Sequence, residues 1–295
     1  MLTCQYNIMP ELPEVETVRK GLQKHVINKE ISQIDLGWPG AIKTNVDKFV
    51  KIVLNNKIKK IDRVGKLLIF EFSKGSDFLL VHLKMTGQLI YVSSKEVVAG
   101  GHKLTDADLC VPNKYTWVTF SFANCSKLYF NDMRKFGYLK LSSQKEKEKI
   151  ISQFGPEPLQ PQFTLKKFEQ ILKNRKTNIK TILLNQKLIA GIGNIYADEI
   201  CFLAKVRPDR KINDLTKKEV KKIHQACKNV LRKAIKSGGT TFRDFTDTKG
   251  RRGNFSDQLK VYNRRKQKCL ICKKSIIKKL KVAGRGTHFC SHCQK

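Results

Sequence analysis

Residues 9–18 read Met-Pro-Glu-Leu-Pro-Glu-Val-Glu-Thr-Val, so a proline stands between a methionine and acidic residues. If translation starts at Met9 and that methionine is removed, Pro10 carries a free secondary amine. Such an amine is a nucleophile that can form an iminium link with an aldehyde carbon, as lysine amines do elsewhere. Glu11 and Glu14 place carboxylic acids beside it in sequence. While Met9 is still attached, the Pro10 nitrogen is an amide, so we expect initiation at Met9 and methionine removal.

The same segment has the features of an ordinary helix start. Proline is tolerated in the first turn of a helix, and acidic residues favour that turn. Apolar residues then recur at helical spacing, at Val15, Val18, Leu22 and Val26. On this segment alone, a purely structural helix is the favoured interpretation.

Four of the nine cysteines form two Cys-x-x-Cys pairs, Cys269 with Cys272 and Cys290 with Cys293. Four thiolates complete a tetrahedral shell and leave no open position for water, which is typical of structural rather than catalytic zinc. The sequence therefore predicts one structural Zn²⁺. The other cysteines are scattered, so we expect an intracellular, reducing compartment, such as cytoplasm, nucleoid or organelle stroma.

The composition is strongly basic, with 59 Lys+Arg against 25 Asp+Glu and a formal net charge of +34. The excess is spread along the chain, which favours a folded body with a basic surface and a nucleic-acid partner. Part of it could instead reflect coding bias, because Ile and Asn are also frequent. No apolar run is long enough to predict a membrane span.

Residues 31–141 have the short apolar runs and alternation typical of β-strands, with breaks at residues 63–66, at Gly87 and at residues 124–125. Together with the helix that begins near Pro10, they predict an antiparallel β-sandwich with a flanking helix.

The pattern changes after this region. Residues 142–162 are polar and contain Gly-Pro-Glu-Pro, which predicts a linker. Helical periodicity follows, including a capping box over residues 216–219. We predict an α+β multidomain protein with a β-sandwich domain over residues 9–141, a helical domain over residues 163–256 and a zinc-finger module over residues 257–295.

Several fragments in order resemble the formamidopyrimidine-DNA glycosylase family. They lie at residues 10–16, 82–87, 131–137, 155–159, 191–199 and 238–241, followed by the four-cysteine finger. The resemblance runs from Met9 to Lys295. Leu12 favours this family over the related endonuclease VIII branch, which begins Pro-Glu-Gly-Pro-Glu.

The resemblance implies a bifunctional enzyme of base excision repair. Such an enzyme removes oxidised purines, such as 8-oxoguanine and formamidopyrimidines, and then cuts the strand by β- and δ-elimination. The implied fold is a β-sandwich domain, a helix-two-turns-helix domain and a C-terminal β-hairpin zinc finger, with double-stranded DNA bound between the domains. The expected partner is duplex DNA with oxidised purines or abasic sites, and the expected state is a monomer.

The family's catalytic residues match four positions. Pro10 matches the nucleophile, and Glu11 matches the acid that protonates the sugar ring oxygen. Lys66 matches the proton donor of the first elimination, and Arg285 matches the finger arginine assigned to the second. Because a guanidinium stays protonated, phosphate binding and electrostatic stabilisation are the roles we expect for Arg285.

Expected DNA contacts also follow from the resemblance. Met85, Arg134 and Phe136 match the trio that fills the space left by a flipped-out nucleotide. Asn194, in a glycine turn that opens a helix, fits phosphate binding. The other matched positions are His82, Tyr115 and Arg175, and Arg243 opens a basic, Gly-rich loop that could cap the flipped base.

Some positions depart from the family pattern. Tyr115 stands where histidine is frequent, Met133 replaces a proline, Lys84 replaces a glycine and Arg175 replaces a lysine. One alternative is a non-catalytic damaged-DNA binding protein, which would apply if the Pro10 amine is blocked. A zinc-ribbon nucleic-acid module joined to an unrelated β domain would explain the charge and cysteines, but not residues 10–11 or Asn194.

Overall fold

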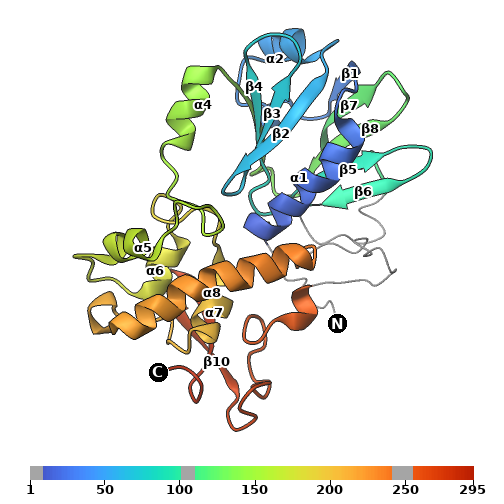
Figure 1. Cartoon of the computed structure of the whole chain (residues 1–295). Coiled ribbons are helices and arrows are strands. Elements are labelled where there is room, and N and C mark those ends of the chain that lie inside the picture. The colour runs from blue at the N-terminus through green and yellow to red at the C-terminus, as the bar shows by residue number, and fades with distance from the viewer. Residues whose placement is uncertain (1–8, 101–109, 241–254) are drawn as a thin grey trace. The chain divides into compact units, whose positions relative to one another are not determined.

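The computed structural model describes residues 9–100, 110–240 and 255–295 (Figure 1). It separates into two compact units. The first ends at Ser152 and also takes in the segment that begins at Ser237, whereas the second comprises residues 153–236 and 255–295. Among the described helices, none is long and apolar enough to cross a membrane.

The first unit is built on two antiparallel sheets. One has the order β1-β7-β8-β5-β6, formed by Ile31–Leu36 (β1), Thr116–Phe122 (β7), Lys127–Asp132 (β8), Gly87–Val92 (β5) and Val97–Gly100 (β6). The other has the order β2-β3-β4-β9, formed by Ile58–Val64 (β2), Leu67–Phe72 (β3), Phe78–His82 (β4) and Tyr138–Ser142 (β9). The predicted β-sandwich is confirmed, with turns at residues 65–66 and 123–126 and a break at residues 83–86, directly before Gly87.

Helix α1 (Leu12–Val26) packs against strands of both sheets (Figure 1). Its predicted apolar stripe is buried, since Val15, Val18, Leu22 and Val26 are at most 2% exposed and belong to the sandwich core. The hydrophobic effect thus fixes the rotation of α1 about its axis, and with it the place of the residues that open the helix.

The described residues of this unit also form three short helices. They are the 3₁₀ turn η1 (Pro39–Ala41), α2 (Val46–Val53) and α4 (Gln144–Ile151). Helix α4 lies within the predicted linker and has no buried residue. It begins because Ser143 and Glu146 form a capping box, which satisfies backbone N–H groups without any tertiary packing.

The second unit is helical and ends in a β-hairpin. Its elements are α5 (Leu165–Leu172), α6 (Ile179–Leu184), α7 (Asn194–Leu203), η2 (Ile212–Asp214), α8 (Lys217–Lys236), η3 (Phe255–Gln258), β10 (Ile277–Val282) and β11 (Arg285–Cys290). The capping box predicted at α8 is present, because Thr216 N–H donates to Glu219 Oε2 at 2.8 Å and Glu219 N–H donates to Thr216 Oγ1 at 3.2 Å.

Candidate functional site

The start of α1 is buried and tightly bonded. Pro10 is buried, and Glu11 and Glu14 are 1% and 0% exposed. Glu11 N–H donates to Glu14 Oε2 at 2.9 Å within a capping box. The sequence therefore folds into a helix here, as predicted, and that helix fixes the backbone on which Pro10 and Glu11 sit.

The other oxygen of Glu14 binds a residue from far along the chain. Glu14 Oε1 accepts hydrogen bonds from Thr240 N–H at 2.8 Å and Thr240 Oγ1 at 3.0 Å. Gly239 makes this approach possible, because it has φ +77° and a Cβ there would lie 2.7 Å from Glu14 Oε1. Only glycine satisfies both requirements without strain.

Lys66 lies in the turn between β2 and β3 and is 8% exposed. Gly65 has φ +59°, and its carbonyl accepts a hydrogen bond from Arg63 Nη1 at 2.7 Å. Arg63 Nε in turn lies 3.0 Å from Glu16 Oε2 on α1. This chain of contacts couples the turn that carries Lys66 to the helix that follows Pro10.

The Glu16 carboxylate also binds Arg19, with Nη2 of Arg19 2.7 Å from Glu16 Oε1. Burial raises the pKa of Glu16, but hydrogen bonds from Arg19 and Arg63 outweigh that effect and hold the pKa below its ordinary value. Glu16 therefore stays ionised and keeps Arg63 in place.

His82 ends β4 and is held as a neutral ring. Its Nδ1 accepts a hydrogen bond from Lys84 N–H at 3.0 Å, so the proton of the neutral ring lies on Nε2. Burial, reinforced by the charges of Lys84 and Lys66, lowers the His82 pKa to about 3. The ring can thus offer an N–H donor to a phosphate oxygen at any neutral pH.

One buried carboxylate joins the two loops that carry the predicted trio. Asp132 Oδ2 accepts from Gly137 N–H at 2.6 Å, and Asp132 Oδ1 accepts from Arg134 N–H at 3.1 Å and from the Thr86 hydroxyl. Arg134 N–H also lies 3.0 Å from Thr86 Oγ1. Thr86 follows Met85, so the structure brings the turn of Met85 and the loop of Arg134 and Phe136 together.

The side chains of this pair of loops are presented outward. Phe136 is 52% exposed, Met85 is half-buried, and the Arg134 guanidinium lies over the Phe136 ring at 4.8 Å. The backbone carbonyl of Tyr115 accepts a hydrogen bond from Asp132 N–H at 3.0 Å, which places Tyr115 beside the same loops. Met133, where the family has proline, is 48% exposed at the tip. These loops therefore present exposed apolar side chains next to the guanidinium of Arg134.

In the second unit, Asn194 opens α7 after the N-cap residue Gly193. Asn194 Nδ2 donates to the Gly286 carbonyl of β11 at 3.1 Å. Asn194 Oδ1 is buried, and no hydrogen-bond partner for it is found among the described residues. The start of α7 and the finger hairpin therefore form one assembly.

A buried ion pair strengthens that assembly. Lys180 on α6 and Asp198 on α7 are both 0% exposed, and Lys180 Nζ lies 2.5 Å from Asp198 Oδ1. Lys180 also donates to Thr287 Oγ1 at 2.8 Å, while Asp198 Oδ2 accepts from His288 N–H at 2.7 Å. Both charges are thus satisfied by groups of the finger hairpin, as buried charges require.

Arg285 begins β11 and is exposed next to the tight turn at Ala283 and Gly284. Both turn residues have positive φ, +49° and +73°, the backbone of a two-residue hairpin turn. The β-hairpin that the resemblance implies for the finger is therefore present, and Arg285 lies directly after its turn. Arg175 is exposed between α5 and α6, where its Nε donates to the Ile171 carbonyl at 2.7 Å.

The four cysteines of the finger converge as predicted. Their Sγ atoms all lie within 4.8 Å of one another, with 3.9 Å between Cys269 and Cys293 and 3.7 Å between Cys272 and Cys290. A tetrahedral zinc with Zn–S bonds of about 2.3 Å requires S–S distances of roughly 3.8 Å. The donor set therefore fits one structural zinc ion, which would hold the base of the β10–β11 hairpin closed.

Sequence reasoning missed the buried partners that position these residues. Asp132 and Lys180 carry no local pattern that marks them as buried, although the adjacent acids Asp198 and Glu199 in an otherwise apolar helix were a usable signal. Arg243 lies outside the described residues.

Three family models match the chain in order. The formamidopyrimidine-DNA glycosylase N-terminal domain matches residues 9–139, and the corresponding H2TH (helix-two-turns-helix) domain matches residues 154–246. The zinc finger found in this family and in IleRS matches residues 266–295. Together they cover most of the chain, and the finger match contains all four cysteines.

Full-length relatives agree with these matches. A formamidopyrimidine-DNA glycosylase of Listeria innocua is 41% identical over 97% of this chain and 100% of its own length, and that of Desulforamulus reducens is 42% identical over 97% and 99%. Two solved structures from Lactococcus lactis, one of a mutant Fpg with Fapy-dG-containing DNA and one of Fpg with abasic-site DNA, superpose with TM-scores of 0.84 and 0.83 at 35% identity, over 97% of this chain and 100% of theirs. This chain therefore belongs to the formamidopyrimidine-DNA glycosylase family, as a DNA-binding repair glycosylase with a zinc finger.

Proposed function

We propose that this protein is a bifunctional DNA glycosylase and abasic-site lyase that removes oxidised purines, such as 8-oxoguanine and formamidopyrimidines, from double-stranded DNA. The observation that carries the proposal is the arrangement at the start of α1. There, a buried Pro10–Glu11 pair is fixed by Glu14 and coupled through Glu16 and Arg63 to the turn of Lys66. Cleavage of a glycosidic bond through an iminium, followed by elimination of phosphate, needs a nucleophile, an acid and a cation held close together.

In this proposal, the Pro10 nitrogen attacks C1′ of the damaged nucleotide. The C1′–N glycosidic bond breaks, and the base leaves with its electron pair and gains a proton. Glu11 protonates the ring oxygen O4′ as the sugar opens, which leaves an iminium between Pro10 and C1′. This role requires a site that keeps the Glu11 carboxyl protonated near neutral pH.

The iminium then makes the C2′ protons acidic. Loss of one C2′ proton expels the 3′ phosphate, and a second elimination expels the 5′ phosphate. Lys66 is the proposed proton donor of the first step. Arg285 is proposed to stabilise the departing phosphate of the second step, because its guanidinium holds its charge throughout.

In this proposal, the damaged DNA is recognised by residues outside the catalytic set. Met85, Arg134 and Phe136 would fill the gap left by the flipped nucleotide, since wedged apolar groups and a cation suit an unstacked base step. His82 and Asn194 would bind phosphates, and Tyr115 and Arg175 would add contacts to the DNA backbone. We propose that the protein acts as a monomer.

Single-turnover cleavage of an 8-oxoguanine duplex by protein that starts at Pro10 tests this function. The proposal expects strand products with phosphate at both ends of the gap. Glu11→Gln should slow base removal by roughly 10²–10⁴-fold, the usual contribution of a general acid. Tight binding of the lesion duplex without base removal or cleavage would instead indicate a non-catalytic damaged-DNA binding protein.

A further inference from the structure

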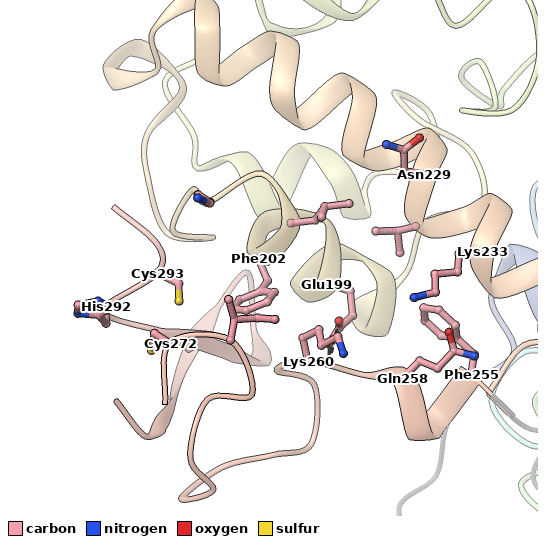
Figure 2. Close-up of a pocket in the computed structure, with 14 residues that line it drawn as sticks. Glu199, Phe202, Asn229, Lys233, Phe255, Gln258, Lys260, Cys272, His292 and Cys293 are labelled. Atoms are coloured by element: carbon pink, nitrogen blue, oxygen red, sulfur yellow. Dashed lines mark hydrogen bonds between the residues drawn. The ribbon is translucent and has the colours of Figure 1, made fainter. Parts of the chain in front are cut away.

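A groove in the second unit is lined by residues of α7, α8 and the finger, with the zinc ligands Cys272 and Cys293 at one end. It has a volume of about 540 Å³, within the range of ligand sites in proteins. Figure 2 shows Glu199 and Phe202 of α7 between Cys272 and Cys293 on one side and Lys233 and Phe255 on the other. Asn194, at the start of the ten-residue helix α7, lies roughly 7.5 Å along the axis from Glu199 and roughly 14 Å from Leu203, both of which line the groove.

The groove has an apolar surface that is open to solvent. Phe202, Val230 and Phe255 are buried beneath it, whereas Leu203 and Ile271 are 52% and 61% exposed. Large aliphatic side chains that face water within one groove are costly to leave exposed, and apolar patches rimmed by polar residues mark sites of association.

The rim of this groove is basic. Lys205, Lys233 and Lys260 line it, and Glu199 is the sole acid among the described lining residues. The Glu199 carboxylate is already occupied, because it accepts backbone N–H groups of Lys260, Val261 and Tyr262 at 2.9 Å each. Burial, the largest influence, also raises its pKa. With three lysines and one buried acid among its described lining residues, the groove presents an excess of positive charge around an apolar floor.

We propose that this groove binds a segment of a partner protein in which acidic residues adjoin large apolar side chains. The apolar side chains would cover Leu203 and Ile271, and the acids would meet the lysine rim. DNA fits less well, because its phosphate backbone offers nothing to bury an aliphatic floor, and phosphate binding would not require one. The inference does not depend on the lyase chemistry.

Fluorescence anisotropy with the zinc-loaded full chain tests the proposal. The probe is a fluorescein-labelled peptide of three aspartates followed by leucine, glycine, phenylalanine and leucine. Leu203→Gln should weaken binding by roughly tenfold through lost apolar burial. Lys233→Glu should weaken it by about fivefold or more. Peptides with asparagines in place of the aspartates, or serines in place of the apolar residues, should each bind more weakly.

Matched variants outside the groove distinguish binding in the groove from non-specific binding. Val97→Gln removes another exposed aliphatic residue, 41% exposed, and Lys221→Glu reverses an exposed charge on α8 outside the groove. Both should leave peptide affinity unchanged, and Leu203→Gln should leave cleavage of a lesion duplex unchanged. No peptide binding, or equal losses in the groove and control variants, would overturn the proposal. Loss of duplex binding in Leu203→Gln would overturn it in favour of a DNA surface.

Discussion

The carboxylate of Glu14 ties Thr240 to the first turn of α1. Its Oε1 accepts both Thr240 N–H and Thr240 Oγ1, across 226 residues of sequence, while its Oε2 accepts Glu11 N–H. One buried side chain thus fixes the proposed acid and a distant segment to the same point. The position of Glu11 is therefore a property of the fold of the whole first unit, as well as of its helix.

Gly239→Ala should be more destabilising than Gly75→Ala, although both glycines have similar positive φ, +77° and +81°. A Cβ at Gly75 would have nothing within 4 Å. The free energy of unfolding of that variant should therefore fall only by the cost of an L side chain at positive φ, about 1–2 kcal/mol. Gly239→Ala also displaces Glu14 and should lose about 1–3 kcal/mol more, because buried N–H groups are left unsatisfied. Urea unfolding measures both, and equal losses would contradict the role given to Glu14.

Lys180→Met should be strongly destabilising, because it leaves the fully buried Asp198 without its ion-pair partner. Breaking a buried pair costs about 3–5 kcal/mol. The double variant Lys180→Met/Asp198→Asn should recover part of that loss. Lys187 is an exposed lysine that follows α6, so Lys187→Met is the matched control. Its free energy of unfolding should stay within about 0.5 kcal/mol of that of the unchanged protein. If Lys180→Met lowers the free energy of unfolding no more than the control does, Lys180 is not the partner on which the buried Asp198 depends.

The strands, α1, the α8 capping box and the cysteine knuckles were all predictable, because each leaves a pattern within a few residues of sequence. Contacts between distant residues leave no such pattern. Lys180, Asp198 and Thr287 meet only after three elements pack, and a lysine destined for burial has the same side chain as an exposed one. Helix α4 lies in the predicted linker, where residues 144–149 are all polar and give no apolar periodicity, so only its capping box marks it in the sequence.

His82 should make the protein lose stability as the pH falls. Its pKa is about 3 in the folded state against the ordinary 6.5, so between these values the unfolded state binds more protons. The free energy of unfolding should therefore drop by up to about 1.4 kcal/mol per pH unit below pH 6.5 from this residue. Denaturant unfolding of His82→Gln should show a shallower drop between pH 7 and pH 5. An unchanged slope would show that His82 is not the neutral ring described above.

Removal of zinc should unfold the finger. Metal analysis should find one zinc per chain, and Cys272→Ser should lose it because three thiolates hold zinc more weakly than four. Cys125→Ser, at an exposed cysteine outside the cluster, is the control and should retain the metal. In Cys272→Ser the amide protons of β10 and β11 should exchange faster, while those of β2 and β3 keep their protection. Full zinc content in Cys272→Ser would exclude this ligand set.

The most direct test of the proposed chemistry is borohydride trapping on an 8-oxoguanine duplex, because hydride reduces an iminium to a stable amine. Two proteins would be compared after intact-mass verification, one that starts at Pro10 and one that keeps Met9 as a blocking residue. The account predicts a covalent protein–DNA band for the first, with the DNA attached at Pro10 by peptide mapping, and none for the second. A band of equal strength in both proteins, or no band from a verified free Pro10 that binds the duplex tightly, would contradict it.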